Sequence, residues 1–185
     1  TINQAALEKG QFWLDAPVSG GEQGARTGQL SIMCGGSVEA YEKAKAILNH
    51  YAKGISHQGE AGAGQLTKMA NQIAVAGVIE GLAEALHFAE QAGLNPANVI
   101  DAISQGAAQS WQMDNRADTM IKGKYNHGFA VDLMRKDLAI CLNEARRLKA
   151  TLPMTALVDQ FYADVQNLGG GRWGTSSLLL RYKKK

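Results

Sequence analysis

Three polar residues at the start of a long apolar stretch have the types and the spacing that proton transfer needs. Lys68 is followed at i+3 and i+4 by Asn71 and Gln72, so a helix places the three side chains on one face. Burial disfavours an ammonium ion, and the positive end of a helix dipole adds to this effect, so both lower the pKa of a lysine in such a place. Lys68 is therefore a candidate general acid or base, with the two amides orienting it and a substrate oxygen. The alternative is a surface lysine whose ammonium group reaches water.

The stretch at 59–93 is the element that must position these side chains. It opens with a glycine-rich turn and then continues without proline, and the seven residues from Ile73 to Ile79 carry no polar side chain. This pattern predicts one long central helix at about 63–92. Because the run is apolar on all faces, we expect it to be buried on all sides.

The segments before this helix alternate between strand and helix, which is typical of an α/β sheet. Between the first two expected strands lies a loop with four glycines, at 19–28. Dense glycine lets backbone N–H groups approach an anion closely, but a plain turn has the same composition, and the pattern leaves both readings open. The expected elements are the end of a helix at 1–9, strands at 11–18, 30–34 and 55–58, and a helix at 38–51.

The rest of the chain is predicted to be helical. Pro96 and Pro153 stand at first helical positions, where the missing N–H of proline costs nothing. We expect helices at 97–105, 110–120, 131–150, 153–167 and 176–182, with a loop at 122–128. The predicted fold class is mainly α, with an all-α domain at 59–185 organised on the central helix and a partial α/β edge at 1–58 before it.

Composition and charge argue against several kinds of partner. The chain has 19 Lys+Arg and 17 Asp+Glu, and the net charge of +2 gives no electrostatic case for nucleic acid. The lysine tail at 183–185 is interpreted as a solvated terminus, because three charges are a weak membrane anchor. No run approaches the roughly 18 to 20 apolar residues that span a bilayer, and the N-terminus has no signal-peptide pattern. We therefore expect a cytoplasmic protein without a membrane partner.

Metal and hydrolytic motifs are also missing from the sequence. Cys34 and Cys141 lie far apart and the four histidines have no paired ligand spacing, so we expect buried thiols and no metal site. Lys68 is neither preceded by glycine nor followed by Ser or Thr, as a phosphate loop requires, and Ser19 lacks a G-x-S-x-G elbow. The chain has no complete dinucleotide fingerprint, in which a G-x-G-x-x-G turn joins a strand to a helix.

Three motifs, in this order, resemble the β-hydroxyacid dehydrogenases, which include 3-hydroxyisobutyrate dehydrogenase and tartronate semialdehyde reductase. The first runs from Asp15 to Gly36, the second from Gly62 to Gln72, and the third from Gly128 to Leu138. Together they extend over nearly the whole chain. The resemblance implies hydride transfer between NAD or NADP and a small 3-hydroxy acid or semialdehyde.

The resemblance also implies roles for particular residues. Lys68 is the matching general acid or base, and Asn71 is the second catalytic residue. The expected substrate-binding residues are Ser19, Gly20, Gly21, Gln72 and Phe129. The expected cofactor-binding residues are Lys136, which would reach the cofactor or substrate, and Asp137, which would fix Lys136.

The sequence departs from the family pattern in two ways. Family members begin with a complete dinucleotide-binding domain, so we expect this chain to be a fragment that is inactive by itself. In that reading 1–58 is the remnant of the Rossmann-type NAD(P)-binding domain, and 59–185 is a substrate and dimerisation domain resembling the C-terminal domain of 6-phosphogluconate dehydrogenase. The long helix would then form a homodimer or tetramer. Secondly, Gly174 stands where the family usually carries an aspartate.

Two other functions remain as alternatives. A non-catalytic helical dimerisation or binding module could retain the motifs as scaffold, and an imine-type reductase on the same fold typically replaces the lysine. The presence of Lys68 favours the dehydrogenase over both. The choice between NAD and NADP, and between 3-hydroxyisobutyrate, tartronate semialdehyde and a longer ω-hydroxy acid, stays open.

Overall fold

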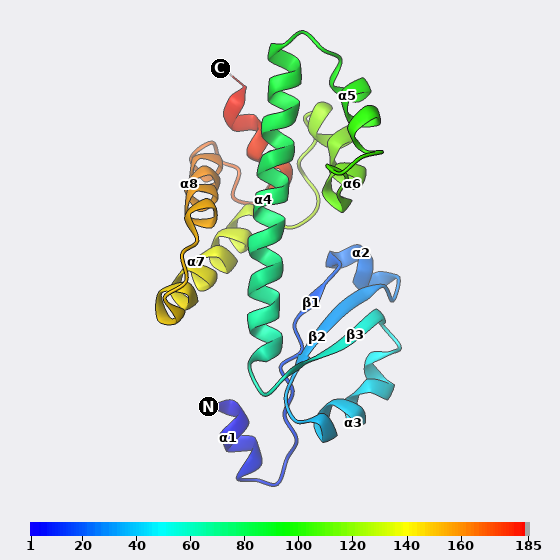
Figure 1. Cartoon of the computed structure of the whole chain (residues 1–185), viewed down its shortest axis with the longest axis vertical. Helices are drawn as coiled ribbons and strands as arrows, with labels where there is room; N and C mark the ends of the chain where they lie inside the picture. The colour runs from blue at the N-terminus through cyan, green and yellow to red at the C-terminus, as the bar shows by residue number, and fades with distance from the viewer. Residues whose placement is uncertain (184–185) are drawn as a thin grey trace. The chain divides into compact units, whose positions relative to one another are not determined.

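The computed structural model describes residues 1–183, which form two compact units. The first spans Thr1–Asn71 and the second begins at Gln72, within the long helix α4 (Ala63–Gln91). Figure 1 labels the α-helices and strands of both units. Two residues of the predicted lysine tail, Lys184 and Lys185, lie outside the described residues. The predicted domain division at residue 58 stays a prediction.

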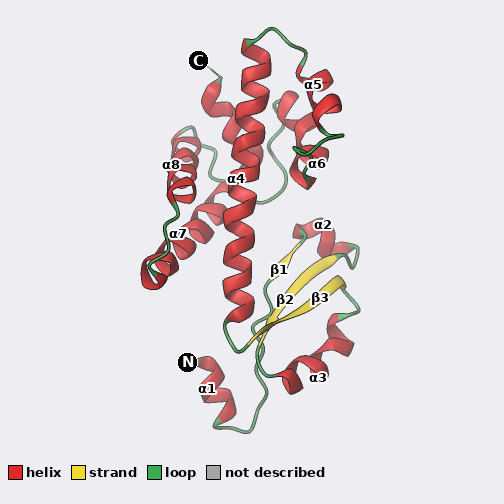
Figure 2. Ribbon diagram, viewed as in Figure 1, coloured by secondary structure: helices red, strands yellow, loops and turns green. Residues whose placement is uncertain are grey.

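A three-stranded sheet in the order β1-β2-β3 forms the centre of the first unit (Figure 2). The short β1 is antiparallel to β2, and β2 is parallel to β3. A helix crosses over between the two parallel strands, as parallel pairing requires. The elements of this unit before α4 are α1 (Ile2–Leu7), β1 (Val18–Ser19), α2 (Gly21–Arg26), β2 (Leu30–Gly35), α3 (Val38–Leu48) and β3 (Ala52–Gly59).

The strand predicted at 11–18 is wrong in extent. Only its last residue, Val18, lies in β1, and Asp15 forms an isolated bridge with Gly35. Pro17 stands between them and has no N–H to donate, which interrupts the ladder. The pairing register nevertheless continues without a shift from Ser19 back to Asp15. The chain therefore runs alongside β2 from Asp15 to Ser19 without being a regular strand over that whole length.

The glycine-rich segment predicted as a loop at 19–28 contains the six-residue helix α2. Gly20 before the helix has φ 125° and Gly28 after it has φ 67°, so glycine is used at both ends of the helix. Inside the helix, Gly24 is buried against Leu30 of β2. The glycines thus serve two tight turns and one close contact with the sheet.

The first unit has a small core of its own, made by β2 and α3. Its buried members are Leu30, Ile32, Cys34 and Tyr41. Cys34 is a free thiol, as predicted, and burial raises the pKa of that thiol. The sheet of the first unit is therefore stabilised by apolar packing against α3 as well as by backbone hydrogen bonds.

The second unit is all helical, as predicted. Its helices agree with the predicted ones within a few residues, and the last one is a 3₁₀ helix. After the main part of α4 come α5 (Pro96–Ile103), α6 (Trp111–Ile121), α7 (Val131–Leu148), α8 (Pro153–Asn167) and η1 (Thr175–Tyr182). Asn95 caps α5 and Ser110 caps α6 through their side-chain oxygens.

One apolar core holds these helices together. From α4 it includes Ile79, Leu82 and Leu86, each no more than 4% exposed. They pack with buried residues of α6, α7, α8 and η1, namely Met113, Met120, Met134, Leu138, Val158, Tyr162, Val165, Leu178 and Leu179. Removing these apolar side chains from water stabilises the second unit.

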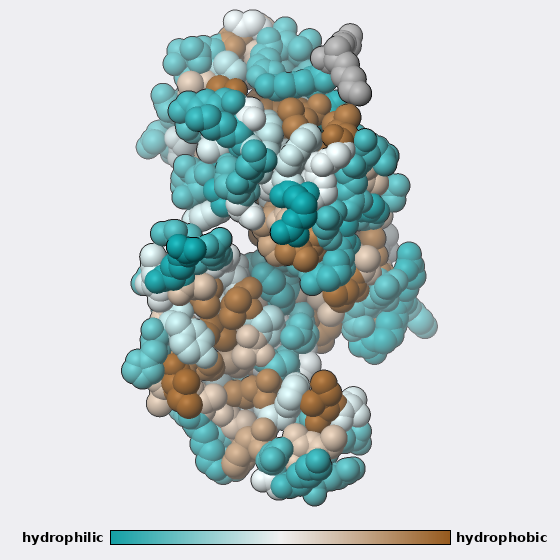
Figure 3. Space-filling model, turned by 180° about the vertical axis from the view of Figure 1, so that it is seen from behind, coloured by the Kyte–Doolittle hydropathy of each residue, from teal (hydrophilic) through white to brown (hydrophobic). Residues whose placement is uncertain are grey.

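Within this chain, one face of the apolar run of α4 is not buried, so its burial on all sides stays a prediction that depends on further neighbours such as a second copy. Within that run Ala74 is exposed and Val78 is 40% exposed, and further along Phe88 is 71% exposed. Figure 3 shows apolar side chains, in brown, reaching the surface of the chain between hydrophilic ones. The core residues of α4 repeat at i+3 and i+4 and so form one face, which is the side that the described helices cover.

Among the described residues, α4 is also long and apolar enough to cross a membrane. The prediction that no segment approaches that length is therefore wrong by this measure. Core helices of soluble proteins meet the same criterion, and 44% of the most apolar window of α4 is buried inside the structure. Length and composition alone therefore do not make α4 a membrane helix.

Candidate functional site

The predicted substrate loop lies in the first unit, where β1 ends and α2 begins. Ser19 is the last residue of β1, Gly20 precedes α2, and Gly21 is its first residue. The first N–H groups of any helix have no partner within the helix, so the backbone here offers donors of the kind that the predicted carboxylate site needs. Glu22 in the same turn is exposed and paired with Arg26 at 2.7 Å, so its negative charge is partly offset.

The predicted catalytic residues lie on α4, as the spacing indicated. Lys68 and Asn71 are half-buried and belong to the first unit, whereas Gln72 is buried and opens the second. The helix is regular through this region, so Lys68 shares a face with both amides. Within the first unit, the turn before Lys68 also contacts the sheet, since Thr67 Oγ1 donates to Gln58 Oε1 at 3.1 Å.

A hydrogen-bonded chain joins the second and third motifs inside the second unit. Gln72 Nε2 on α4 donates to Asp137 Oδ2 on α7 at 2.7 Å. The other oxygen of Asp137 pairs with Lys136 Nζ at 2.9 Å. The Asp137 side chain is 16% exposed, whereas that of Lys136 is 61% exposed. The carboxylate therefore bridges a buried amide to a cation that stands in solvent.

Phe129 lies just before α7, in the segment that pairs with the C-terminal glycines. Its carbonyl accepts from Thr175 N–H at 2.9 Å, and its side chain is 39% exposed. Next to it, Ala130 and Gly174 form an isolated antiparallel bridge. The ring of Phe129 is thus on the surface of the second unit, on a backbone that is fixed on both sides.

The structure gives a steric reason for the glycine at 174. Gly174 N–H donates to Tyr125 O at 2.7 Å, and a Cβ at this position would overlap the carbonyl oxygen of His127. An aspartate cannot be accommodated at Gly174 without moving that loop. Any contact that relatives make through an acid at this position is therefore not available to this chain through residue 174.

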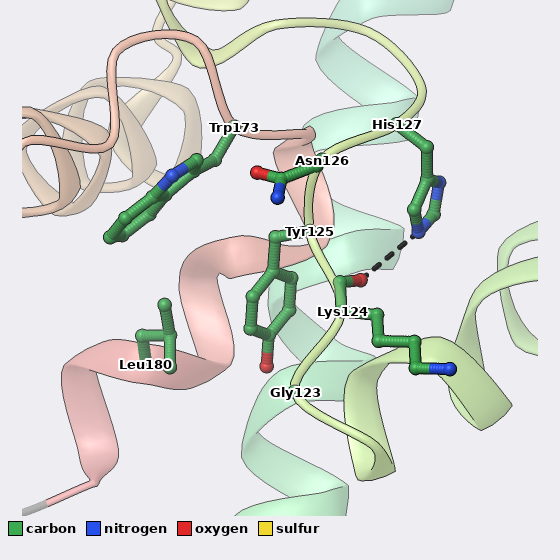
Figure 4. A pocket seen from close by; sticks show the side chains of 7 residues that line it. All are labelled: Gly123, Lys124, Tyr125, Asn126, His127, Trp173 and Leu180. Carbon is green, nitrogen blue, oxygen red and sulfur yellow. Dashed lines mark hydrogen bonds between the residues drawn. The ribbon is translucent and has the colours of Figure 1, made fainter.

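A cavity of ≈ 530 Å³ in the second unit is separate from the predicted site residues. Its lining consists of Gly123, Lys124, Tyr125, Asn126, His127, Trp173 and Leu180. Figure 4 shows the rings of Trp173 and Tyr125 on the same side of the loop as Leu180, with His127 and Lys124 pointing to the other side. Burial raises the pKa of Tyr125 to about 12, so its hydroxyl keeps its proton and donates to Met120 O at 3.2 Å.

The described residues hold no group of three or more His, Cys, Asp or Glu side chains that could bind a metal ion. Gly169 to Gly174 has the spacing G-x-G-x-x-G, but it follows α8 and precedes η1, so it is not a turn between a strand and a helix. The chain as described therefore offers no complete dinucleotide fingerprint in its structural setting.

One residue that the motifs contained without a role of its own is Asp15. It is 8% exposed, and its carboxylate accepts hydrogen bonds from the backbone at the start of α4. The sequence indicates this role only indirectly. Because α4 is preceded by Gly62, which has no side chain to cap the helix, an acceptor from another part of the chain is needed.

Comparison with known families matches both parts of the chain. Residues 62–182 match the family described as NAD-binding of NADP-dependent 3-hydroxyisobutyrate dehydrogenase. Residues 1–62 match the NAD-binding domain of 6-phosphogluconate dehydrogenase. Both descriptions are of nicotinamide-dinucleotide-binding regions, and together the two matches define the class of protein to which this chain is similar.

Individual relatives narrow that class. An uncharacterized oxidoreductase of Shewanella frigidimarina is 56% identical over 93% of this chain and 59% of its own length. The 2-hydroxy-3-oxopropionate reductase of Escherichia coli is 42% identical over 93% of this chain and 59% of its own. The crystal structure of a 3-hydroxyisobutyrate dehydrogenase from Salmonella typhimurium superposes with a TM-score of 0.86 at 31% identity, over 97% of this chain and 64% of that one.

The chain belongs to the β-hydroxyacid dehydrogenase family. NAD or NADP is the cofactor of this family. The chain spans about three fifths of the length of these relatives.

Proposed function

We propose that this chain is part of an NAD(P)-dependent oxidoreductase that transfers a hydride between the cofactor and a small 3-hydroxy acid or its semialdehyde. The observation that supports it most directly is the chain from Gln72 through Asp137 to Lys136. It joins two motifs that lie 65 residues apart in the sequence, and both were assigned to one site from the resemblance alone. A scaffold that only packed helices would not need a buried amide and carboxylate facing each other here.

In this proposal Lys68 removes the hydroxyl proton of the substrate during oxidation and returns it during reduction. Asn71 orients Lys68 and the reacting oxygen. Ser19, Gly20 and Gly21 bind the substrate carboxylate through a hydroxyl and backbone N–H groups. The reaction therefore needs Lys68 unprotonated in one direction and protonated in the other.

The residues of α7 fit a negatively charged cofactor group. Bound NAD(P) supplies the hydride acceptor or donor at its nicotinamide ring. The Lys136 side chain is exposed, and its ammonium group has three N–H donors, more than the pair with Asp137 uses. That pair restricts the positions that the ammonium group can take. Gln72 holds Asp137 in turn, so the orientation of the cation depends on a residue of the helix that carries Lys68. Phe129 would cover the substrate from the adjoining segment.

The test is Lys68→Ala in the full-length protein, with the interconversion of NAD(P) and NAD(P)H followed by absorbance. Each candidate substrate is supplied in turn: 3-hydroxyisobutyrate, tartronate semialdehyde in the reductive direction, and a longer ω-hydroxy acid. Loss of a general base lowers kcat by about 10²- to 10⁴-fold. The matched control is Lys122→Ala, which removes an exposed lysine paired with Asp118. A loss of less than tenfold in the Lys68 variant, or an equal loss in the control, would rule out the role.

The same assay separates the enzyme from a binding module. We expect the 185 residues by themselves to be inactive with NAD(P), because the main dinucleotide fingerprint is not among them. The exposed apolar residues of α4, such as Val78 and Phe88, are the observation that favours a helical binding module. A full-length protein that binds a partner through α4 but neither reduces NAD(P) nor oxidises NAD(P)H with any substrate of the panel would support that second function.

A further inference from the structure

The first turn of α4 is held by a side chain from a distant part of the first unit. Gly62 N–H donates to Asp15 Oδ1 at 2.6 Å, and Gln65 N–H donates to Asp15 Oδ2 at 2.9 Å. The two pairs are 47 and 50 positions apart in the sequence. Asp15 is 8% exposed, so these bonds are sheltered from competing water. Both carboxylate oxygens are thus used by one helix terminus.

No side chain at the N-cap position of this helix is available to accept from its first turn, although the Ala63 N–H donates to Glu60 O at 2.9 Å. α4 begins at Ala63, and the residue before it, Gly62, has φ 101° and no side chain. The first turn contains no acidic residue either. An N-cap side chain normally accepts from the third helical N–H, and its own N–H is often bonded by a side chain in return. Asp15 performs both functions from outside the helix, and its negative charge lies at the positive end of the helix dipole.

Two further glycines fit around the carboxylate. A Cβ at Gly35 would lie 2.6 and 2.7 Å from the oxygens of Asp15, and one at Gly64 would lie 2.7 Å from Oδ2. The backbone of Asp15 is itself bonded to Gly35 in both directions, at 3.0 and 2.8 Å. The carboxylate is therefore enclosed between the end of β2 and the first turn of α4, and it has little freedom to move.

Asp15 also stands between the two parts of the proposed site that belong to the first unit. Ser19 follows it by four residues, in unbroken register along β2. Lys68 follows Gln65 by three residues, which is about 4.5 Å along the helix axis. We propose that Asp15 is a positioning residue that sets where Lys68 stands relative to the substrate loop at Ser19–Gly21. This inference rests on the proposed function of Lys68.

The test is a double-mutant cycle in the full-length protein, with Asp15→Asn and Lys68→Ala. Asparagine keeps the shape of the side chain, but it leaves one acceptor oxygen and turns an N–H₂ donor towards a backbone donor. A misplacement of about 1 Å costs on the order of 10²-fold in rate, so we expect kcat per folded molecule to fall about tenfold to a hundredfold. The KM for NAD(P) should stay within about twofold. In the Lys68→Ala background the same change should cost little further, because the group that it positions is gone.

Several results would overturn the inference. One is a kcat within twofold of the wild type once the folded fraction is measured by circular dichroism. Another is an equal proportional loss in both backgrounds, which a general weakening of the fold would produce. The matched control is Asp101→Asn, an exposed aspartate of α5, which should leave kcat unchanged. If Lys68→Ala alone leaves kcat intact, the proposed function fails. That outcome is measured in the Lys68→Ala single variant, in which Asp15 is unchanged, so it is distinguishable from a failure of the inference about Asp15.

The capping contact has a separate readout that needs no activity. In the 185-residue chain, the Gly62 and Gln65 amides should be protected from hydrogen exchange, and Asp15→Asn should remove protection from both. Unchanged protection would contradict the capping role. If the asparagine variant is unfolded at the assay temperature, Asp15→Ser, which keeps one hydroxyl acceptor, is measured at lower temperature, and the same non-additivity with Lys68→Ala is expected.

Discussion

Removing the hydroxyl of Tyr182 should destabilise the helical unit without changing its packing. Tyr182 in η1 donates to Glu80 Oε1 on α4 at 2.5 Å, and Glu80 is 7% exposed. The ring stacks on His87 with centroids 4.8 Å apart, and Tyr182→Phe preserves that contact. The second oxygen of Glu80 is buried and has no hydrogen-bond partner among the described residues. A hydrogen bond to a charged group contributes about 1.5–3 kcal/mol, so we expect a loss in this range.

The assay is urea unfolding followed by circular dichroism. With an m-value of about 2 kcal/mol per molar urea, a loss of about 2 kcal/mol lowers the midpoint by about 1 M. Tyr51→Phe, at an exposed tyrosine of the first unit, is the matched control and should shift the midpoint by less than a quarter of that. If the two variants behave alike, or if m changes instead of the midpoint, the reasoning about the buried Glu80–Tyr182 bond is refuted.

Two more predictions concern buried charge in the helical unit. Burial raises the pKa of Glu80, against the lowering effects of Tyr182 and Arg181. Because the folded state binds the proton more tightly than the unfolded state, protonation of Glu80 stabilises the fold at low pH. This contribution to stability is lost as pH rises from about 4.5 through the folded pKa. Glu80→Gln cannot ionise, and its Tm relative to wild type should therefore rise between pH 4 and pH 7; a pH-independent difference would contradict this. Asp159→Asn breaks a paired contact with Arg135, at 3.0 and 3.2 Å, and should cost about 1.5–3 kcal/mol in urea unfolding, whereas an unchanged midpoint would show that the pair contributes nothing.

Much of the fold could be predicted from hydrophobic pattern and helix signals. The strand at Leu30–Gly35 and the helix that starts at Pro153 were predicted within one residue, because a short apolar run closed by glycine and a proline at a first helical position are strong local signals. The long helix could also be predicted, because neither proline nor another strong helix breaker interrupts it.

Other features depend on contacts that the sequence does not display. The composition of the segment before Pro17 predicts a strand, but in the structure this segment forms only an isolated bridge between Asp15 and Gly35, which Pro17 separates from β1. A run that is apolar on all faces predicts burial on all sides, but the described residues cover α4 on one side only, so the exposed face of Val78 and Phe88 depends on neighbours outside this chain. The spacing of Lys68, Asn71 and Gln72 indicated a shared helix face, but the bond from Gln72 to Asp137 depends on tertiary packing 65 residues away.

Asp15, Gly35 and Gly64 have a consequence for how this protein can change over evolutionary time. The carboxylate is fitted between two glycines so closely that a methyl group at either one would meet its oxygens. A longer acid, or a side chain at one glycine, cannot be introduced alone without displacing the others. We therefore expect these three positions, far apart in the sequence, to accept substitutions only in combination, so that they are inherited as a single unit.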